Sequence, residues 1–152
     1  MSGCPLRPEG LSITQCLING DLAVMDHDVE NAIEHYSQVL AKNPLHFEAV
    51  QKRAKLYKQT NRIKEAILDF TSAMRTRFDD ASLFYERGQL YLMMTPPQSE
   101  EALLDFRAAL QRNEVFWAAM LGEVQSLIQI GQYTDAIRIC KVIIEGKRCE
   151  QC

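Results

Sequence analysis

Small, apolar and aromatic residues recur along the chain at helical spacing. Aligning the segments NAIEHYSQVL, EAILDFTSAM, EALLDFRAAL and DAIRICKVII superposes four alanines that are 34, 36 and 34 residues apart. These alanines are Ala32, Ala66, Ala102 and Ala136. The residues four positions later are Tyr36, Phe70, Phe106 and Cys140. Since residues three and four apart share one face of a helix, each segment is predicted to be an amphipathic helix that packs through this stripe.

A second amphipathic stretch precedes each of these helices. Its matching positions hold Gly20, Ala54, Gly88 and Val124, followed three residues later by Ala23, Tyr57, Tyr91 and Leu127. The segments between the two stretches, at 26–28, 60–62, 94–99 and 131–132, are typical helix-stop sequences. Pro96 and Pro97 supply the two extra residues of the third copy, where they are expected to lengthen a loop. Each unit is therefore predicted to be a helical hairpin.

This pattern resembles the tetratricopeptide repeat, whose 34-residue unit is a helix-turn-helix. The segments RAKLYKQTNRIKEAILDFTSAM and ERGQLYLMMTPPQSEEALLDFRAAL match it best. The family's closing proline occurs only as Pro44 and its tight-turn glycine only as Gly131, and Ala23 replaces the usual aromatic residue. The resemblance implies an all-α, right-handed solenoid of about four repeats. We expect an N-terminal extension at 1–12 and a repeat domain at 13–150, divided into 13–46, 47–80, 81–116 and 117–150.

Composition and charge narrow the class of protein further. With 152 residues, of which 47% are hydrophobic, the chain is long enough for one globular domain. Its net charge of -3 makes nucleic acid a poor default partner. The chain lacks an apolar run of about 18 residues and an apolar signal at its start, which predicts a cytoplasmic protein without a membrane span. The odd number of cysteines, five, favours free thiols over structural disulfides.

The residues that could carry chemistry form no recognisable site. The chain has no phosphate-binding glycine loop, zinc helix or nucleophile elbow, and its acidic residues are predicted to face solvent on their helices. His27 is expected in a turn, His35 on the outer side of its helix and His46 at a repeat junction, so no metal site is predicted. A single C-x-x-C, formed by Cys149 and Cys152, is a weak metal or redox signal. We expect neither enzymatic activity nor a cofactor.

The resemblance implies a function in protein binding, because the first helices of such hairpins line a concave groove. The residues predicted to line it include Leu17, Asp21, Gln51, Lys52, Lys55, Lys58, Tyr85, Gln89, Leu121 and Gln125. Residues 47–80 carry a net charge of +3 and residues 13–46 one of -4. An acidic or amide-rich extended peptide would suit the lysines, although lysines can also simply solvate a surface.

Some members of the family hold the C-terminal carboxylates of chaperones with lysine and asparagine side chains. In the register of the first repeat, those positions hold Leu17, Asp21, Lys52, Ser82 and Glu86. One repeat later they hold Gln51, Lys55, Glu86, Ala118 and Gly122. Neither set collects enough donors for two carboxylates, and Glu86 would repel them. Binding of a chaperone C-terminal tail is therefore not expected.

The last helix departs from the pattern. Ile139 and Val142 occupy positions that hold mostly polar residues in the earlier copies, and Ile143 adds to an almost continuous apolar surface. Terminal repeats usually need a polar outer face, so something should cover this helix. A following helix, a second copy of the chain and a partner helix are all compatible with the sequence. An assembly subunit that self-associates or docks through this edge is thus the alternative to groove binding.

Overall fold

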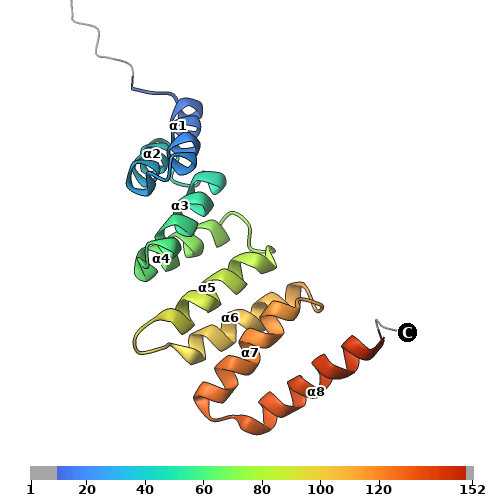
Figure 1. The fold of residues 1–152 in the computed structure, drawn as a ribbon. Coiled ribbons are helices and arrows are strands. Elements are labelled where there is room, and N and C mark those ends of the chain that lie inside the picture. The colour runs from blue at the N-terminus through green and yellow to red at the C-terminus, as the bar shows by residue number, and fades with distance from the viewer. Residues whose placement is uncertain (1–9, 150–152) are drawn as a thin grey trace, which may run out of the picture.

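The computed structural model describes residues 10–149, with the side chains of 147–149 excepted, and this part of the chain contains eight α-helices and no strand (Figure 1). The helices are α1 (Ile13–Met25), α2 (Val29–Lys42), α3 (Phe47–Gln59), α4 (Ile63–Met74), α5 (Ala81–Met93), α6 (Ser99–Arg112), α7 (Trp117–Ile130) and α8 (Tyr133–Cys149). The predicted all-α fold is confirmed. Cys4, Cys152 and the side chain of Cys149 lie outside the described residues, and so does the predicted C-x-x-C.

Consecutive helices pack in pairs, and each pair packs on the next. α1 packs against α2, α3 against α4, α5 against α6 and α7 against α8, while α2, α4 and α6 each contact the following odd-numbered helix (Figure 1). The predicted helical hairpins are therefore confirmed. The two-proline insertion lies in the connection between α5 and α6, where it lengthens the loop without interrupting either helix.

The tight turns inside the hairpins share one backbone conformation. His27, Asn61 and Gly131 have φ angles of 60°, 58° and 87°, in the left-handed region. The amide after each of them donates to a carbonyl in the preceding helix: Asp28 N to Ala23 O, Arg62 N to Tyr57 O and Gln132 N to Leu127 O. Such a turn terminates a helix by satisfying its last carbonyl groups, and glycine adopts it at least cost. The departure from the family pattern at His27 and Asn61 therefore changes the residue but not the turn.

The aromatic stripe forms the interior, as predicted. Tyr36, Phe70 and Phe106 are fully buried. The rings of Tyr36 and Phe106 occupy space left by glycines on neighbouring helices, since a Cβ on Gly122 would lie 2.5 Å from Phe106 Cε1 and one on Gly20 would lie 2.6 Å from Tyr36 Cε1. The stripe is a packing feature that sets how closely the helices approach one another.

The prediction that the acidic residues face solvent is wrong for three of them. Asp69, Asp105 and Glu123 are buried. Arg53 Nε and Nη2 donate to the two carboxylate oxygens of Asp69, both at 2.7 Å. The hydrogen bonds to Asp69 raise the pKa of Arg53 against the opposing effect of burial. A buried carboxylate is tolerated here because a guanidinium from the partner helix of the hairpin satisfies both of its oxygens.

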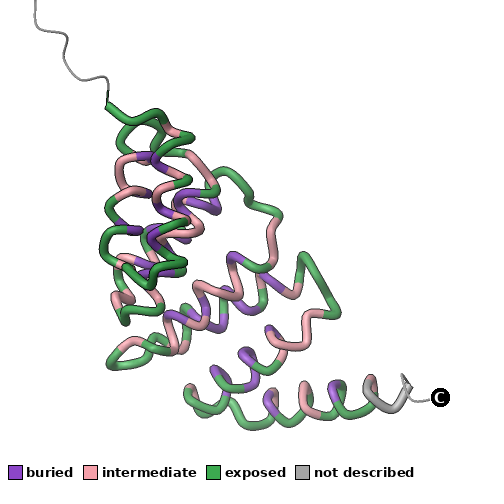
Figure 2. Tube along the Cα trace, turned by 45° about the horizontal axis from the view of Figure 1, so that its top comes forward, coloured by how far each residue is buried: buried purple, intermediate pink, exposed green. Residues whose placement is uncertain are grey.

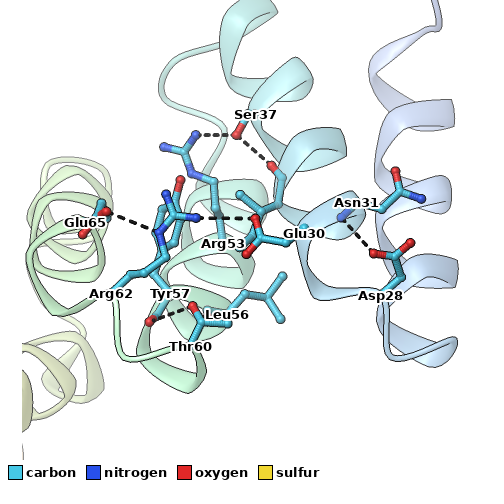
Figure 3. Close-up of polar contacts among 11 residues, drawn as sticks. Asp28, Glu30, Asn31, Ser37, Arg53, Leu56, Tyr57, Thr60, Arg62 and Glu65 are labelled. Carbon is cyan, nitrogen blue, oxygen red and sulfur yellow. Dashed lines mark hydrogen bonds and ion pairs between the residues drawn. The ribbon is translucent and has the colours of Figure 1, made fainter.

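The predicted outward position of His35 is also wrong. His35 is half-buried, and its Nδ1 is buried without a hydrogen-bond partner among the described residues. It occupies the position held by Asp69 and Asp105 in the next two hairpins, which faces the preceding helix of the hairpin. His46 instead caps α3, where its Nδ1 accepts from Ala49 N at 3.3 Å. Asp28 caps α2 in the same manner by accepting from Asn31 N at 3.2 Å (Figure 3).

Candidate protein-binding groove

The first half of the candidate groove is a pocket between α1 and α3. It has a volume of ≈ 360 Å³ and its lining residues are Asp21, Val24, Met25, Tyr36, Lys52, Lys55, Leu56 and Gln59. Val24 and Met25 are 40% and 75% exposed. The pocket thus offers apolar surface next to charged side chains.

The charges in this pocket partly neutralise one another. Lys52 Nζ lies 2.7 Å from Asp21 Oδ1 and 2.8 Å from Glu48 Oε1. Tyr36 donates its hydroxyl hydrogen to Asp21 Oδ1 at 2.6 Å. Burial acts to raise the pKa of Asp21, but the hydrogen bonds from Lys52 and Tyr36 outweigh it and lower this pKa below 3.8. For Tyr36, burial and the bond to Asp21 both raise the pKa. Asp21 is therefore held ionised.

A second ion pair lies on the neighbouring part of the candidate groove and links α3 to α5. Lys58 Nζ lies 2.6 Å from Glu86 Oε2 and 2.7 Å from Gln89 Oε1, which joins α3 to α5. The charges of Lys52 and Lys58 are thus neutralised by ion pairs within the protein. Lys55 is exposed and has no ion-pair partner among the side chains of residues 10–146. Of the three lysines predicted to form a basic band, only Lys55 is free to meet an acidic ligand.

The second half of the groove is a smaller pocket between α5 and α7. It has a volume of ≈ 180 Å³ and its lining residues are Tyr85, Gln89, Leu92, Phe106, Ala118, Leu121, Gly122 and Gln125. The Tyr85 ring packs on Phe116 and Phe106, with centroid distances of 4.9 and 6.0 Å. Buried Phe106 and half-buried Phe116 thus support the Tyr85 ring, while Leu121 remains exposed at the rim.

The structure brings most of the predicted groove residues together. Asp21, Lys52 and Lys55 line the first pocket. Tyr85, Gln89, Leu121 and Gln125 line the second, and Lys58, which lines neither pocket, donates to Gln89 of the second. Leu17 and Gln51 are half-buried and line neither pocket. Sequence spacing did not indicate Tyr36 and Phe106 as lining residues, because both belong to the aromatic stripe that fills the interior. Leu56, a buried residue of α3, was not predicted to line the groove either.

The predicted assembly edge divides into three environments. Ile143 is buried in a core cluster with Leu103 and Leu127, so it cannot contribute to an exposed edge. Ile139 is half-buried and Val142 is exposed. These two line a ≈ 370 Å³ pocket with residues of α6 and α7 and the segment between them: Leu110, Glu114, Met120 and Glu123, together with Arg138. Ile139 and Val142 of α8 therefore face residues of α6 and α7 and do not point away from the stack.

The described residues also bear on whether the chain has a metal site, a disulfide or a membrane span. No group of three or more His, Cys, Asp or Glu side chains in this part of the chain is arranged to hold a metal ion. Cys16 is buried and Cys140 half-buried, and both are free thiols. None of the helices in the described range combines the length and the apolar character needed to cross a bilayer.

Stacked two-helix hairpins with pockets along their odd-numbered helices define an α-solenoid of the protein-interaction class. The family model described as TT21 fifth ARM repeats domain matches residues 14–122, and the tetratricopeptide repeat model matches residues 98–148. The first model covers more than two thirds of the chain, so the chain belongs to the family of the TT21 fifth ARM repeats domain, and its C-terminal third also matches the tetratricopeptide repeat. Human tetratricopeptide repeat protein 21B is 28% identical over 123 residues, which cover 80% of this chain and 9% of that protein. The chain thus spans only a small part of that relative.

Solved structures show the same fold at low sequence identity. A crystal structure of MamA protein superposes with a TM-score of 0.81 and 22% identity, covering 90% of this chain and 73% of that one. A tetratricopeptide repeat protein from Parabacteroides merdae gives a TM-score of 0.79 and 21% identity, covering 93% and 54%. These likenesses establish the solenoid fold, and the family supports a general role as a protein-interaction scaffold.

Proposed function

We propose that the protein is a non-catalytic scaffold that binds an extended segment of another protein along α1, α3, α5 and α7. The observation that carries this proposal is the pair of pockets on neighbouring odd-numbered helices, one of which combines exposed Val24 and Met25 with an unpaired Lys55. Solenoids of this class present extended surfaces of this kind to their ligands.

The chemistry of the first pocket favours a ligand with an apolar side chain next to an acidic one. Met25 and Leu56 would bury the apolar group, which gains about 25 cal/mol for each Å² removed from water. Lys55 would pair with the acidic group, since Lys52 is already engaged by Asp21 and Glu48. Glu86 is neutralised by Lys58, so it does not repel an acidic ligand as strongly as its sequence position suggested.

A displayed library of random peptides, selected against the wild-type protein, tests the proposal. We expect the enriched peptides to carry an apolar residue next to Asp or Glu. Met25→Glu and Lys55→Glu should each weaken their binding by about tenfold or more, equivalent to about 1.4 kcal/mol. Leu68→Glu provides the matched control, because Leu68 is an exposed apolar residue on α4, away from both pockets.

Two results would contradict groove binding. One is the absence of any enriched peptide, and the other is binding that both groove variants retain in full. If Leu68→Glu alone abolished binding, the site would lie on the even-numbered helices.

A further inference from the structure

The junctions between hairpins follow one side-chain pattern. On α6, Leu103, Arg107 and Leu110 are four and three residues apart and so share a face. Arg107 Nε donates to Glu123 Oε1 of α7 at 2.8 Å. Leu103 is buried in a cluster that includes Val124 and Leu127 of α7. The face of α6 that meets the next hairpin therefore consists of a polar residue, Arg107, between two apolar residues, Leu103 and Leu110.

The two earlier junctions repeat this arrangement. On α2 the central polar residue is Ser37, which accepts from Arg53 Nη1 at 2.9 Å (Figure 3). On α4 it is Thr71, which accepts from Arg87 Nη1 at 3.0 Å. The three partners on the following helix, Arg53, Arg87 and Glu123, are 34 and 36 residues apart and hence equivalent. One polar contact at a fixed position thus marks each junction.

α8 carries a fourth copy of this face, made of Ile137, Lys141 and Ile144, which we call the α8 edge. Ile137 and Ile144 are 56% and 55% exposed. Ile33 and Leu103, the equivalents of Ile137 in α2 and α6, are only 6% and 7% exposed because the next hairpin covers them. α8 lies at the end of the described stack, and no described helix packs on its far side (Figures 1 and 2).

The complementary stripe on an odd-numbered helix can be identified in the same way. Gln15 and Leu22 of α1, which no described hairpin precedes, are exposed. Their equivalents in the later odd-numbered helices are all buried: Ala49 and Leu56, Leu83 and Leu90, and Ala119 and Ser126. These positions lie four residues before and three residues after the partner of the central polar residue. A helix that docks on a junction face therefore presents small or apolar residues on both sides of one polar residue.

We propose that the α8 edge binds an amphipathic helix of a partner protein that carries Asp or Glu at the centre of such a stripe. Lys141 can only donate hydrogen bonds, so the central residue of the partner must accept them, and a carboxylate does so with complementary charge. Glu123, which receives Arg107, has this role within the protein. Small or apolar residues four before and three after the acid would cover Ile137 and Ile144. This proposal does not depend on the groove.

A second copy of the chain fits the α8 edge less well. The helix available for head-to-tail stacking is α1, whose stripe is Gln15, Asn19 and Leu22. Asn19 is neutral and already accepts from Gln15 Nε2 at 2.9 Å. α1 therefore offers a single apolar residue and no charge to Lys141, which is why we favour a partner helix over a second copy as the occupant of the α8 edge.

Two stapled helical peptides serve as probes. Both carry leucines four residues before and three residues after the central position, where one peptide has Glu and the other Lys. Fluorescence anisotropy should show that the wild-type protein binds the Glu peptide at least about tenfold more tightly than the Lys peptide. Lys141→Glu should reverse this preference, and Ile137→Ser should weaken binding of the Glu peptide while keeping the preference. Lys64→Glu, an exposed charge reversal on α4, is the matched control and should leave binding unchanged.

Each contrary outcome overturns the proposal. Failure of both peptides to bind would show that the α8 edge does not take a helix. Equal binding of the two peptides, or a preference that survives Lys141→Glu, would show that Lys141 does not select an acid. A wild-type oligomer in light scattering that Lys141→Glu or Ile137→Ser converts to monomer would assign the α8 edge to a second copy. Circular dichroism of each variant verifies that these exposed substitutions leave the helices intact.

Discussion

Arg87 holds Asp105 by two parallel hydrogen bonds of 2.8 Å, from Nε to Oδ2 and from Nη2 to Oδ1. The pair joins α5 to α6, and the remaining Nη1 of Arg87 reaches back to Thr71 of the preceding hairpin. Arg53 makes the corresponding contacts with Asp69 and Ser37 one hairpin earlier. A single arginine thus holds the two helices of its hairpin together and also links the hairpin to the preceding one. The hydrogen bonds to Asp105 raise the pKa of Arg87 against the opposing effect of burial.

Removing one partner of this buried pair should be costly. Asp105→Ala leaves the half-buried guanidinium of Arg87 without its counter-ion, and we expect the free energy of unfolding to fall by about 3 kcal/mol in urea titrations. Replacing both residues, with Arg87→Met and Asp105→Leu, should cost less, because no uncompensated charge remains. Arg138→Ala, which breaks an exposed pair with Asp135, should change the stability by less than about 1 kcal/mol. A value for Asp105→Ala as small as that of this control would contradict the structural role of the pair.

The left-handed turn at His27 predicts a stabilising substitution. A residue with a side chain loses roughly 1–2 kcal/mol of stability when it adopts this φ of 60°. Glycine avoids that strain, but its greater freedom in the unfolded chain lowers the stability by roughly 0.5–1 kcal/mol. His27→Gly should therefore raise the free energy of unfolding by up to about 1 kcal/mol, which thermal denaturation measures as a higher Tm. The reciprocal control, Gly131→Ala, should lower the Tm, because its φ is 87° and no gain in packing compensates. A Tm for His27→Gly below that of the wild type would refute this account of the turn.

Gly122 should resist the smallest enlargement. An alanine Cβ there would lie within 2.5, 2.6 and 2.8 Å of three atoms of the buried Phe106 ring. The gain in helix propensity is about 1 kcal/mol, while overpacking costs typically 1–3 kcal/mol, so we expect net destabilisation by urea unfolding. Phe106→Leu should make Gly122→Ala less costly in a double-mutant cycle, since the ring is the obstacle. Additive effects of the two changes would rule out the ring as the cause.

The lowered pKa of Asp21 should make the free energy of unfolding depend on pH in the acid range. Its folded-state pKa lies below 3.8, because the bonds from Lys52 and Tyr36 outweigh the effect of burial. A carboxylate with a depressed pKa stabilises the fold at pH values above its unfolded pKa of about 3.9, and this contribution is lost as the pH falls through the folded pKa. The difference in unfolding free energy between wild type and Asp21→Asn should therefore be largest near neutral pH and shrink as the pH falls through the folded-state pKa of Asp21. Titration of the Asp21 carboxyl carbon by NMR checks the same claim, and a midpoint above 3.8 would contradict it.

The repeat and its hairpins could be predicted from the sequence because they depend on local periodicity. The spacing of Ala32, Ala66, Ala102 and Ala136 requires only that residues three and four apart share a helix face. The resemblance to the repeat family, rather than periodicity alone, predicted that Tyr85, Gln89, Leu121 and Gln125 face one groove, and these residues line one pocket. It could not reveal that Lys52 and Lys58 are neutralised, because Asp21 and Glu86 approach them only after neighbouring hairpins have stacked.

The burial of Asp69 and Asp105 escaped prediction for a related reason. Each occupies a position that reads as polar and exposed along its own helix, and the arginine that satisfies it comes from the other helix of the hairpin. The apolar character of α8 was evident in the sequence, but not the division of its residues among the core at Ile143, the pocket at Ile139 and the open side at Ile137.

By itself, the sequence determined the number of hairpins, their turns and the residues that fill their interior, since these follow from which side chains share a face of one helix. Only the tertiary structure decided which charges remain free and which apolar faces stay open. Those properties depend on the distances between side chains on different helices, and electrostatic pairing and burial change within a few ångströms.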